Sequence, residues 1–241
     1  MIWRLAWIEW RRLMRTPLAW VVLGLGLCLL SWQFLGTLEA FSGMPANHRN
    51  LGLSHHLGMQ LFGLASVLIL IITPILTTRT FSEAFRNGSY ALLSSAPLST
   101  LSILLGKFLA IQLFQILIVL APLLLSLTLF NGTQLDLGLL ASASLGLLLL
   151  SGSFTAIGLF ISVQSDNPGI AAAGSYGLLL LISLLDQHTG GGSFIHWLAW
   201  PSHYLDMQLG LVRSSDLAFF LLLLLFFLGL ALHRLDKRRR G

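Results

Sequence analysis

The chain has 241 residues, of which 56% are hydrophobic and only 10% are charged. Soluble domains average about 25% charged residues, so this composition excludes a soluble globular protein and predicts an integral membrane protein. The formal net charge is +5, but the basic residues flank hydrophobic runs, where they orient a chain across a membrane, and we expect no nucleic-acid partner. A single cysteine, Cys28, excludes an internal disulfide and a cysteine metal cluster.

Residues 1–15 have the pattern of an amphipathic helix. Apolar and aromatic residues recur at helical spacing, with the arginines mostly at other positions: Trp3, Trp7, Trp10 and Met14. Such a helix is suited to lie in the headgroup layer of the membrane. The alternative is an ordinary basic anchor that flanks the first membrane span.

Six stretches are apolar enough to cross a bilayer, which takes about 20 residues in a helix. The fifth and sixth are near the lower limit of length, and the six are residues 17–37, 57–78, 101–130, 137–163, 169–185 and 217–232. They predict an all-α, polytopic membrane protein with a single transmembrane domain over residues 1–241.

The distribution of charge supports six spans. With a cytoplasmic N-terminus, only Arg49 and Arg213 of the 14 Lys and Arg residues would lie outside, which is a strong positive-inside bias. An odd number of spans would move the basic tail, residues 233–241, to the outer side. We therefore expect both termini in the cytoplasm.

Residues 79–100, between the second and third predicted spans, are polar but compatible with a helix. Thr80 and Glu83 match a capping box, in which two side chains satisfy unpaired amides at a helix start, and Gly88 could divide the segment into two short helices. Four apolar residues would share one face: Phe81, Phe85, Leu92 and Ala96. The segment is interpreted either as a helix that docks on a soluble partner or as a surface helix without one.

Small residues recur every four positions in the fourth and fifth predicted spans: Gly138, Ser142 and Gly146, then Gly169, Ala173 and Gly177. Such stripes let helices approach closely. They predict helix packing within one subunit or, alternatively, a dimer interface. Farther along, residues 187–215 carry Trp197, Trp200 and Tyr204, which are typical of an outer segment at the membrane–water interface.

The sequence lacks the residues on which several functional classes depend. The acidic residues near the spans all fall at predicted ends: Glu39, Asp136, Asp166, Asp186 and Asp216. This placement disfavours a proton-driven carrier or an intramembrane hydrolase, because their ionisable groups lie within spans. There is no G-x-x-x-x-G-K-[ST] phosphate loop and no H-E-x-x-H or G-x-S-x-G motif, so we expect no ATP hydrolysis or other catalysis by this chain.

Six of the seven histidines fall in or beside the predicted outer loops: His48, His55, His56, His188, His196 and His203. Imidazole is a common transition-metal ligand, but this spacing is irregular. Interfacial or solvated histidines are the favoured interpretation, and no metal site is predicted.

Three separated stretches, considered together, resemble the membrane subunits of ABC-2 type transporters, particularly the gliding-motility and NosY-like permeases. "TPLAWVV" at 16–22 is similar to the approach to their first span. "TPILTTRTFSEAFRNGSYALLSSAPLSTLSILLGKFLA" at 73–110 is similar to their long central signature. "SHYLDMQLGLVRSSDLAFF" at 202–220 is similar to the approach to their last span.

The resemblance implies that residues 79–100 contain a cytoplasmic coupling helix, which carries motion from a separate ATPase to the spans. The expected contact residues are Arg79, Phe81, Glu83, Phe85, Arg86 and Asn87. The implied partners are a cytoplasmic ABC ATPase, which uses ATP and Mg²⁺, and a second copy of this chain or a similar permease within the lipid. This chain would bind no cofactor itself, and it would lie in a bacterial inner (plasma) membrane. Its expected function is export; the alternative is mechanical driving of an external protein or maturation factor without solute transport.

Overall fold

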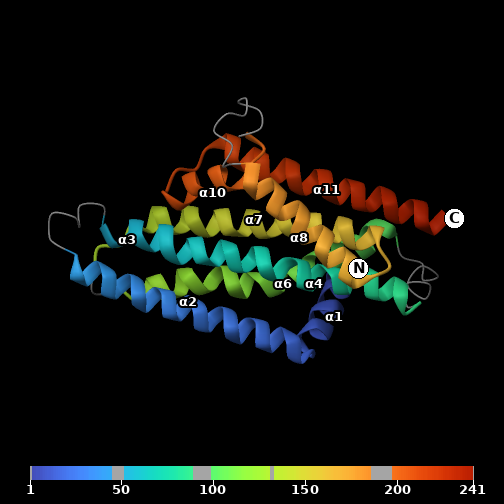
Figure 1. The fold of residues 1–241 in the computed structure, drawn as a ribbon, viewed down its shortest axis with the longest axis horizontal. Helices are drawn as coiled ribbons and strands as arrows, with labels where there is room; N and C mark the ends of the chain where they lie inside the picture. Colours follow the sequence, from blue (N-terminus) through green and yellow to red (C-terminus); the bar gives the residue numbers. More distant parts are fainter. Residues whose placement is uncertain (1, 45–51, 89–98, 131–132, 186–196, 241) are drawn as a thin grey trace.

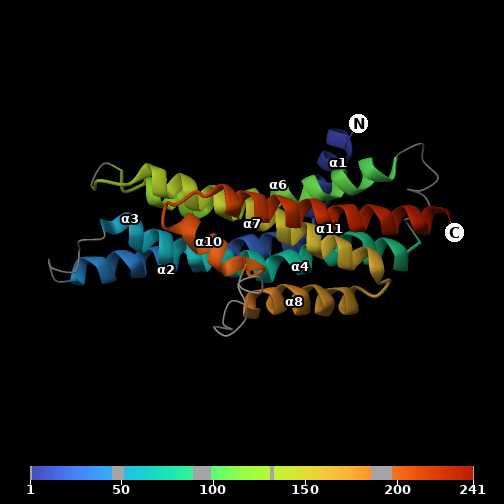
Figure 2. The ribbon, with the colours of Figure 1, turned by 90° about the horizontal axis from the view of Figure 1, so that it is seen from above.

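In the part of the chain that the structure describes, the regular elements are all helices (Figures 1 and 2). The computed structural model describes residues 2–44, 52–88, 99–130, 133–185 and 197–240, and no strand occurs within these ranges. Within these ranges, five helices are long and apolar enough to cross a membrane: α2 (Pro17–Gly43), the continuous helix Gly52–Arg86, α6 (Thr100–Leu127), α7 (Leu137–Gln164) and α11 (Ser214–Arg240). The predicted all-α, membrane-spanning architecture is confirmed at this level.

The second of these helices consists of three consecutive elements. α3 (Gly52–His56) leads into a π-helical turn, η2 (Leu57–Leu61), which continues as α4 (Phe62–Arg86). The other described helices are short: α1 (Ile2–Met14), α8 (Pro168–Leu184) and α10 (Trp200–Gln208).

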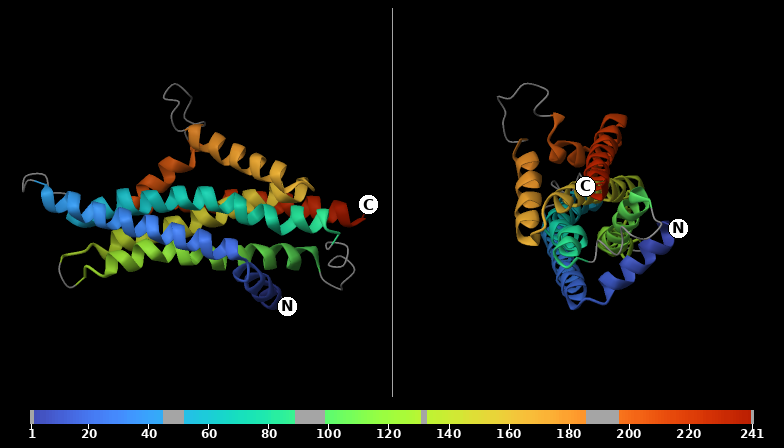
Figure 3. Two further views of the ribbon diagram at one scale, coloured as in Figure 1. Left: turned by 60° about the horizontal axis from the view of Figure 1, so that its bottom comes forward. Right: turned by 90° about the vertical axis from the view of Figure 1, so that its right-hand side faces the viewer.

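The prediction of a full fifth span at 169–185 is not confirmed. The helix there, α8, has 17 residues, or about 25 Å at 1.5 Å per residue, whereas the hydrocarbon core of a bilayer is about 30 Å thick. Asn167 caps its start by accepting a hydrogen bond from the backbone N–H of Gly169 at 2.9 Å. α8 lies on one face of the bundle, opposite the face from which α1 projects (Figures 2 and 3).

The last span, in contrast, is longer than the sequence predicts. It was expected to be short, at 217–232 with a separate basic tail, but α11 continues as one helix from Ser214 to Arg240. In Figure 1, α11 runs back to the end of the bundle that holds the N-terminus, so both ends of the described chain lie at the same end of the bundle.

α7 forms the centre of the bundle. It packs against α4, α6, α8, α10 and α11, and 78% of its most apolar window is buried, against 28% for α2 and 22% for α11. In lipid, where the hydrophobic effect does not drive helices together, close packing and interhelical hydrogen bonds take that role. The small residues of α7 permit such packing, whereas α2 and α11 present large apolar side chains outward.

A hydrogen-bonded chain of polar side chains joins three helices inside the bundle. Gln115 of α6 donates from Nε2 to Oγ1 of Thr73 in α4 at 2.6 Å, and its Oε1 accepts from Oγ1 of Thr155 in α7 at 3.0 Å. All three residues are fully buried. The amide is therefore satisfied on both sides, which makes it tolerable at this depth.

A close approach between α4 and α7 depends on Gly158. A Cβ atom added at this glycine would lie 2.8 Å from Cβ of Thr77 and closer still to its hydroxyl. The two helix backbones could not approach this closely with a larger residue at position 158.

Gly158→Ala is expected to lower the free energy of unfolding by about 1–3 kcal/mol, because the added methyl overpacks the α4–α7 contact. Gly24→Ala in α2 is the matched control, since a Cβ there meets nothing within 4 Å and alanine favours a helix over glycine. Thermal unfolding in detergent measures both variants. Equal shifts for the two would contradict the packing role of Gly158.

Candidate functional site

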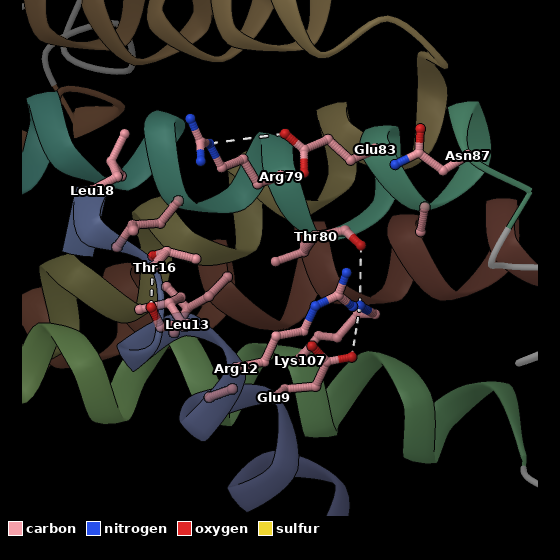
Figure 4. Close-up of a pocket in the computed structure, with 14 residues that line it drawn as sticks. Glu9, Arg12, Leu13, Thr16, Leu18, Arg79, Thr80, Glu83, Asn87 and Lys107 are labelled. Atoms are coloured by element: carbon pink, nitrogen blue, oxygen red, sulfur yellow. Dashed lines mark hydrogen bonds and ion pairs between the residues drawn. The ribbon is translucent and has the colours of Figure 1, made fainter.

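A cavity of about 160 Å³ lies between α1, α4 and α6 at the end of the bundle with both termini (Figure 4). One part of its wall is charged and the other part is apolar. Among the lining residues are Glu9, Arg12, Arg79, Glu83 and Lys107, together with Leu13, Leu18, Leu76, Ala110 and Ile111.

Lys107 lies at the base of this cavity. It sits two turns into α6, and its side chain is only 4% exposed. Nζ donates to Oε1 of Glu9 in α1 and to the backbone carbonyl of Thr80 in α4, both at 3.0 Å. It also lies 5.2 Å from the ring centroid of Phe81. A buried charge is costly unless it is paired and hydrogen-bonded, and these contacts meet that requirement while joining three helices.

α1 docks on α6 beside this lysine. Ala6 is fully buried, Leu5, Trp10 and Leu13 pack against the core, and the exposed side includes Trp3. Figure 3 shows α1 bending away from the axis of α2. The helix expected over residues 1–15 is thus present as α1, with one face on α6 and one face free for other contacts.

The predicted capping box at Thr80 is wrong. α4 continues without interruption through Thr80 and Glu83 to Arg86, and the Thr80 hydroxyl donates to the carbonyl of Thr77 at 2.6 Å instead of capping a helix start. The chain has no glycine or proline between Pro74 and Gly88, so nothing stops the helix earlier. Gly88 then adopts φ +68°, a left-handed conformation that commonly ends helices.

Residues 79–87, expected to belong to a separate coupling helix, therefore form the end of α4 and its cap. The second part of that segment, with Leu92 and Ala96, lies outside the described residues. No independent helix between the second and third spans is seen in the part that the structure describes.

The six expected contact residues do not form one surface. Arg86 and Asn87 are exposed, and the side chains of Arg79 and Glu83 are 48% and 35% exposed, with their charged groups 3.9 Å apart. In contrast, Phe81 is fully buried. Phe85 is half-buried, with the Arg238 guanidinium 4.4 Å from its ring centroid. The polar residues are accessible to a partner, while the two phenylalanines connect them to the bundle.

Hydrogen bonds hold the end of α4 to α7, and Arg238 of α11 packs against the same end of α4. The Ser82 hydroxyl donates to the Ser162 carbonyl at 3.0 Å, and the Ser82 backbone N–H donates to the Ser162 hydroxyl at 3.1 Å. Arg238, above Phe85, binds Asp166 at 2.6 Å and the carbonyl of Gln164 at 3.3 Å. Together with the Lys107 bridge, these contacts link the end of α4 to α1, α6, α7 and α11.

The two small-residue stripes have different surroundings. In α7, the Ser142 hydroxyl donates to the Met207 carbonyl of α10 at 2.8 Å, and a Cβ at Gly146 would lie 3.0 Å from the Tyr204 ring. At Gly138 an added Cβ would meet only Asp136. In α8, the stripe faces away from the rest of the described chain and consists of Gly169, Ala173 and Gly177.

A second buried polar contact joins α10 and α11. His203 is 8% exposed, with Nδ1 2.7 Å from Asp216 Oδ1 and Nε2 2.9 Å from the Trp197 carbonyl. Because a carbonyl oxygen only accepts hydrogen bonds, Nε2 carries a proton here. The expectation of a solvated histidine is wrong for His203, which is buried, whereas its expected interfacial position stays a prediction.

No group of three His, Cys, Asp or Glu residues suited to a metal occurs in the described ranges. His48, His188 and His196 lie outside those ranges.

Sequence reasoning missed the two buried pairs. Lys107 was counted only as a charge that orients the chain, although "LLGKFLA" shows a lysine with apolar residues on both sides. Its partner Glu9 is 98 positions away, so no local pattern identifies the pair. His203 and Asp216 are 13 positions apart, with no periodic signal linking them.

No protein-family model matches the sequence, and a search of curated proteins finds no match. The function of the site therefore has to be inferred from its own geometry and from the sequence pattern.

Lys107→Met is expected to loosen α1, because it leaves the Glu9 carboxylate, 16% exposed, without its partner. Removing one member of a buried pair costs about 3 kcal/mol or more. Hydrogen–deuterium exchange of the α1 amides should rise, and adding Glu9→Gln should partly restore protection. Arg79→Met is the control, since its pair is long and half exposed. Unchanged exchange in α1 would show that the bridge does not hold it.

Asp216→Ala is expected to lower the free energy of unfolding by about 2 kcal/mol, because it leaves Nδ1 of a buried histidine without a partner. Asp206→Ala removes the more exposed pair with Arg213 and should cost less than about 1 kcal/mol. Thermal unfolding of the two variants tests the difference. A larger loss for Asp206→Ala would contradict the assignment.

Proposed function

We propose that this chain is the membrane subunit of an ABC-2 type transporter, which couples ATP hydrolysis by a separate cytoplasmic ATPase to export of a substrate. The observation that carries the proposal is the end of α4. Its polar tip is exposed, while the adjoining turns are joined by specific contacts to helices α1, α6 and α7. An element of this kind can receive force from a bound protein and pass it into the membrane domain.

The path of that force follows from the contacts. A displacement at Arg86 and Asn87 would move Phe81 and Thr80, which contact Lys107. Lys107 would pass the movement to α1 through Glu9, and Ser82 would pass it to α7 through Ser162. Because packed interfaces shift between discrete arrangements rather than deform continuously, the spans would move as connected units.

The orientation of the molecule supports the same function. The end that carries the α4 tip also carries the arginines of α1 and the basic end of α11. Basic residues favour the cytoplasmic side, where an ATPase and its ATP and Mg²⁺ are found. In this proposal both termini are cytoplasmic, the membrane is a bacterial inner membrane, and two such subunits, identical or similar, enclose the substrate path.

The second candidate is a mechanotransmitting subunit that drives an external protein. The buried His203–Asp216 pair favours it, because it joins the outer helix α10 directly to α11. Motion of α11 would then reach the outer surface without a solute path.

The paired charge reversal Glu83→Arg with Arg86→Glu should reduce the ATPase recovered with the affinity-purified chain by about tenfold or more, because like charges brought together at an interface cost several kcal/mol. The measurement is ATPase activity and mass-spectrometric identification of a phosphate-loop ATPase in the complex purified from its native membrane.

The paired reversal Asp206→Arg with Arg213→Glu is the matched control, since these residues form an ion pair away from the α4 tip. Equal recovery from both double variants would reject the α4 tip as the contact. A chain that purifies from its native membrane with no phosphate-loop ATPase would reject the transporter proposal.

A further inference from the structure

We propose that the cavity between α1, α4 and α6 is a binding site for the phosphate of one anionic glycerophospholipid, whose acyl chains leave along its apolar wall. This site goes beyond the transporter function and requires no ATPase.

The charges around the cavity leave one cation in excess. Three cationic side chains, Arg12, Arg79 and Lys107, face two carboxylates, Glu9 and Glu83. Lys107 pairs with Glu9 at 3.0 Å, and Arg79 lies 3.9 Å from Glu83. Arg12 makes no ion pair in the described part of the chain. An anion entering the cavity therefore meets net positive charge.

Two of the three cations, Arg12 and Lys107, converge on one place, whereas Arg79 is directed towards Glu83. Figure 4 shows the Arg12 guanidinium directed towards Lys107 and Thr80, close enough for the two like charges to repel. An ammonium group has three N–H donors, and two of those on Lys107 have protein acceptors. A phosphate oxygen placed between Arg12 and Lys107 would relieve the repulsion and accept charge-assisted hydrogen bonds, for which the arginine fork is well suited.

The cavity wall changes from charged to apolar with depth, as a phospholipid changes from its headgroup to its acyl chains. In α4, Leu76 lies three residues deeper in the bundle than Arg79, and in α6, Ala110 and Ile111 lie three and four residues deeper than Lys107. At 1.5 Å per residue, the wall becomes apolar about 5 Å below the charges. A free inorganic anion has no apolar group to contact that part of the wall, whereas the acyl chains of a glycerol ester would pack against it.

Size and location agree with this ligand. The volume of about 160 Å³ is close to that of an engineered cavity that holds benzene, about 150 Å³, so a phosphate group fits inside it. α1 carries further exposed arginines and an exposed Trp3. Basic and aromatic residues in such a helix draw anionic lipid to the surface.

The test measures how many lipid molecules stay bound to the full chain after purification in neutral detergent. Native mass spectrometry after addition of phosphatidylglycerol or phosphatidylcholine should detect one retained phosphatidylglycerol and no comparable phosphatidylcholine. Arg12→Gln with Arg79→Gln should reduce the retained phosphatidylglycerol about tenfold or more. Arg12→Gln alone, which changes an exposed and unpaired side chain, should also reduce the retained phosphatidylglycerol.

The matched control is Arg11→Gln with Arg15→Gln, which removes the same charge from α1 at positions that do not line the cavity. Equal loss in both double variants would show diffuse surface attraction and overturn the site. No loss in either would also overturn it, as would a lower melting temperature of the cavity variants with unchanged lipid. Displacement of the lipid by inorganic phosphate at equal concentration would overturn the lipid assignment in favour of a free anion.

Discussion

The arrangement at the basic end of the bundle depends on the pairing of one buried cation. Lys107 extends from α6 into a space with little water, where an unpaired charge is unfavourable. It is stabilised by a carboxylate from α1 and a carbonyl from α4. The position of α1, the cavity beside it and the link from the α4 tip to the other helices all follow from that requirement. Phe81 lies against the same cation.

The rest of the bundle obeys the rules of packing in lipid. Small residues bring α4 and α7 together at Gly158. Gln115 joins three helices by hydrogen bonds to two buried hydroxyl groups, which have no water to bond with instead. Large apolar side chains face outward on α2 and α11. This division makes α7 the fixed centre and leaves the α4 tip and α1 as the elements with exposed polar surface. A lipid between α1 and α4 would sit where these two elements meet.

Most spans could be predicted because membrane insertion requires local, contiguous hydrophobicity. The fourth span was expected at 137–163 and α7 covers Leu137–Gln164, and the third was expected at 101–130 and α6 covers Thr100–Leu127. Errors arose where hydropathy and helix formation do not end together. α4 and α11 continue into polar sequence, because charged side chains at a helix end remain hydrated and no residue before Gly88 breaks α4. The apparent capping box was an ordinary turn within that helix.

Composition and short-range pattern were sufficient to identify a membrane protein, most of its spans, its basic end and the absence of a phosphate loop. Which polar residues lie inside depends on how the helices pack in the folded chain. Glu9 and Lys107 are 98 positions apart, and Ser82 and Ser162 are 80 apart. Their pairing is set by how helices pack in three dimensions, which no local periodicity encodes. For the same reason, only the folded chain shows that Phe81 is buried while its neighbour Glu83 remains accessible.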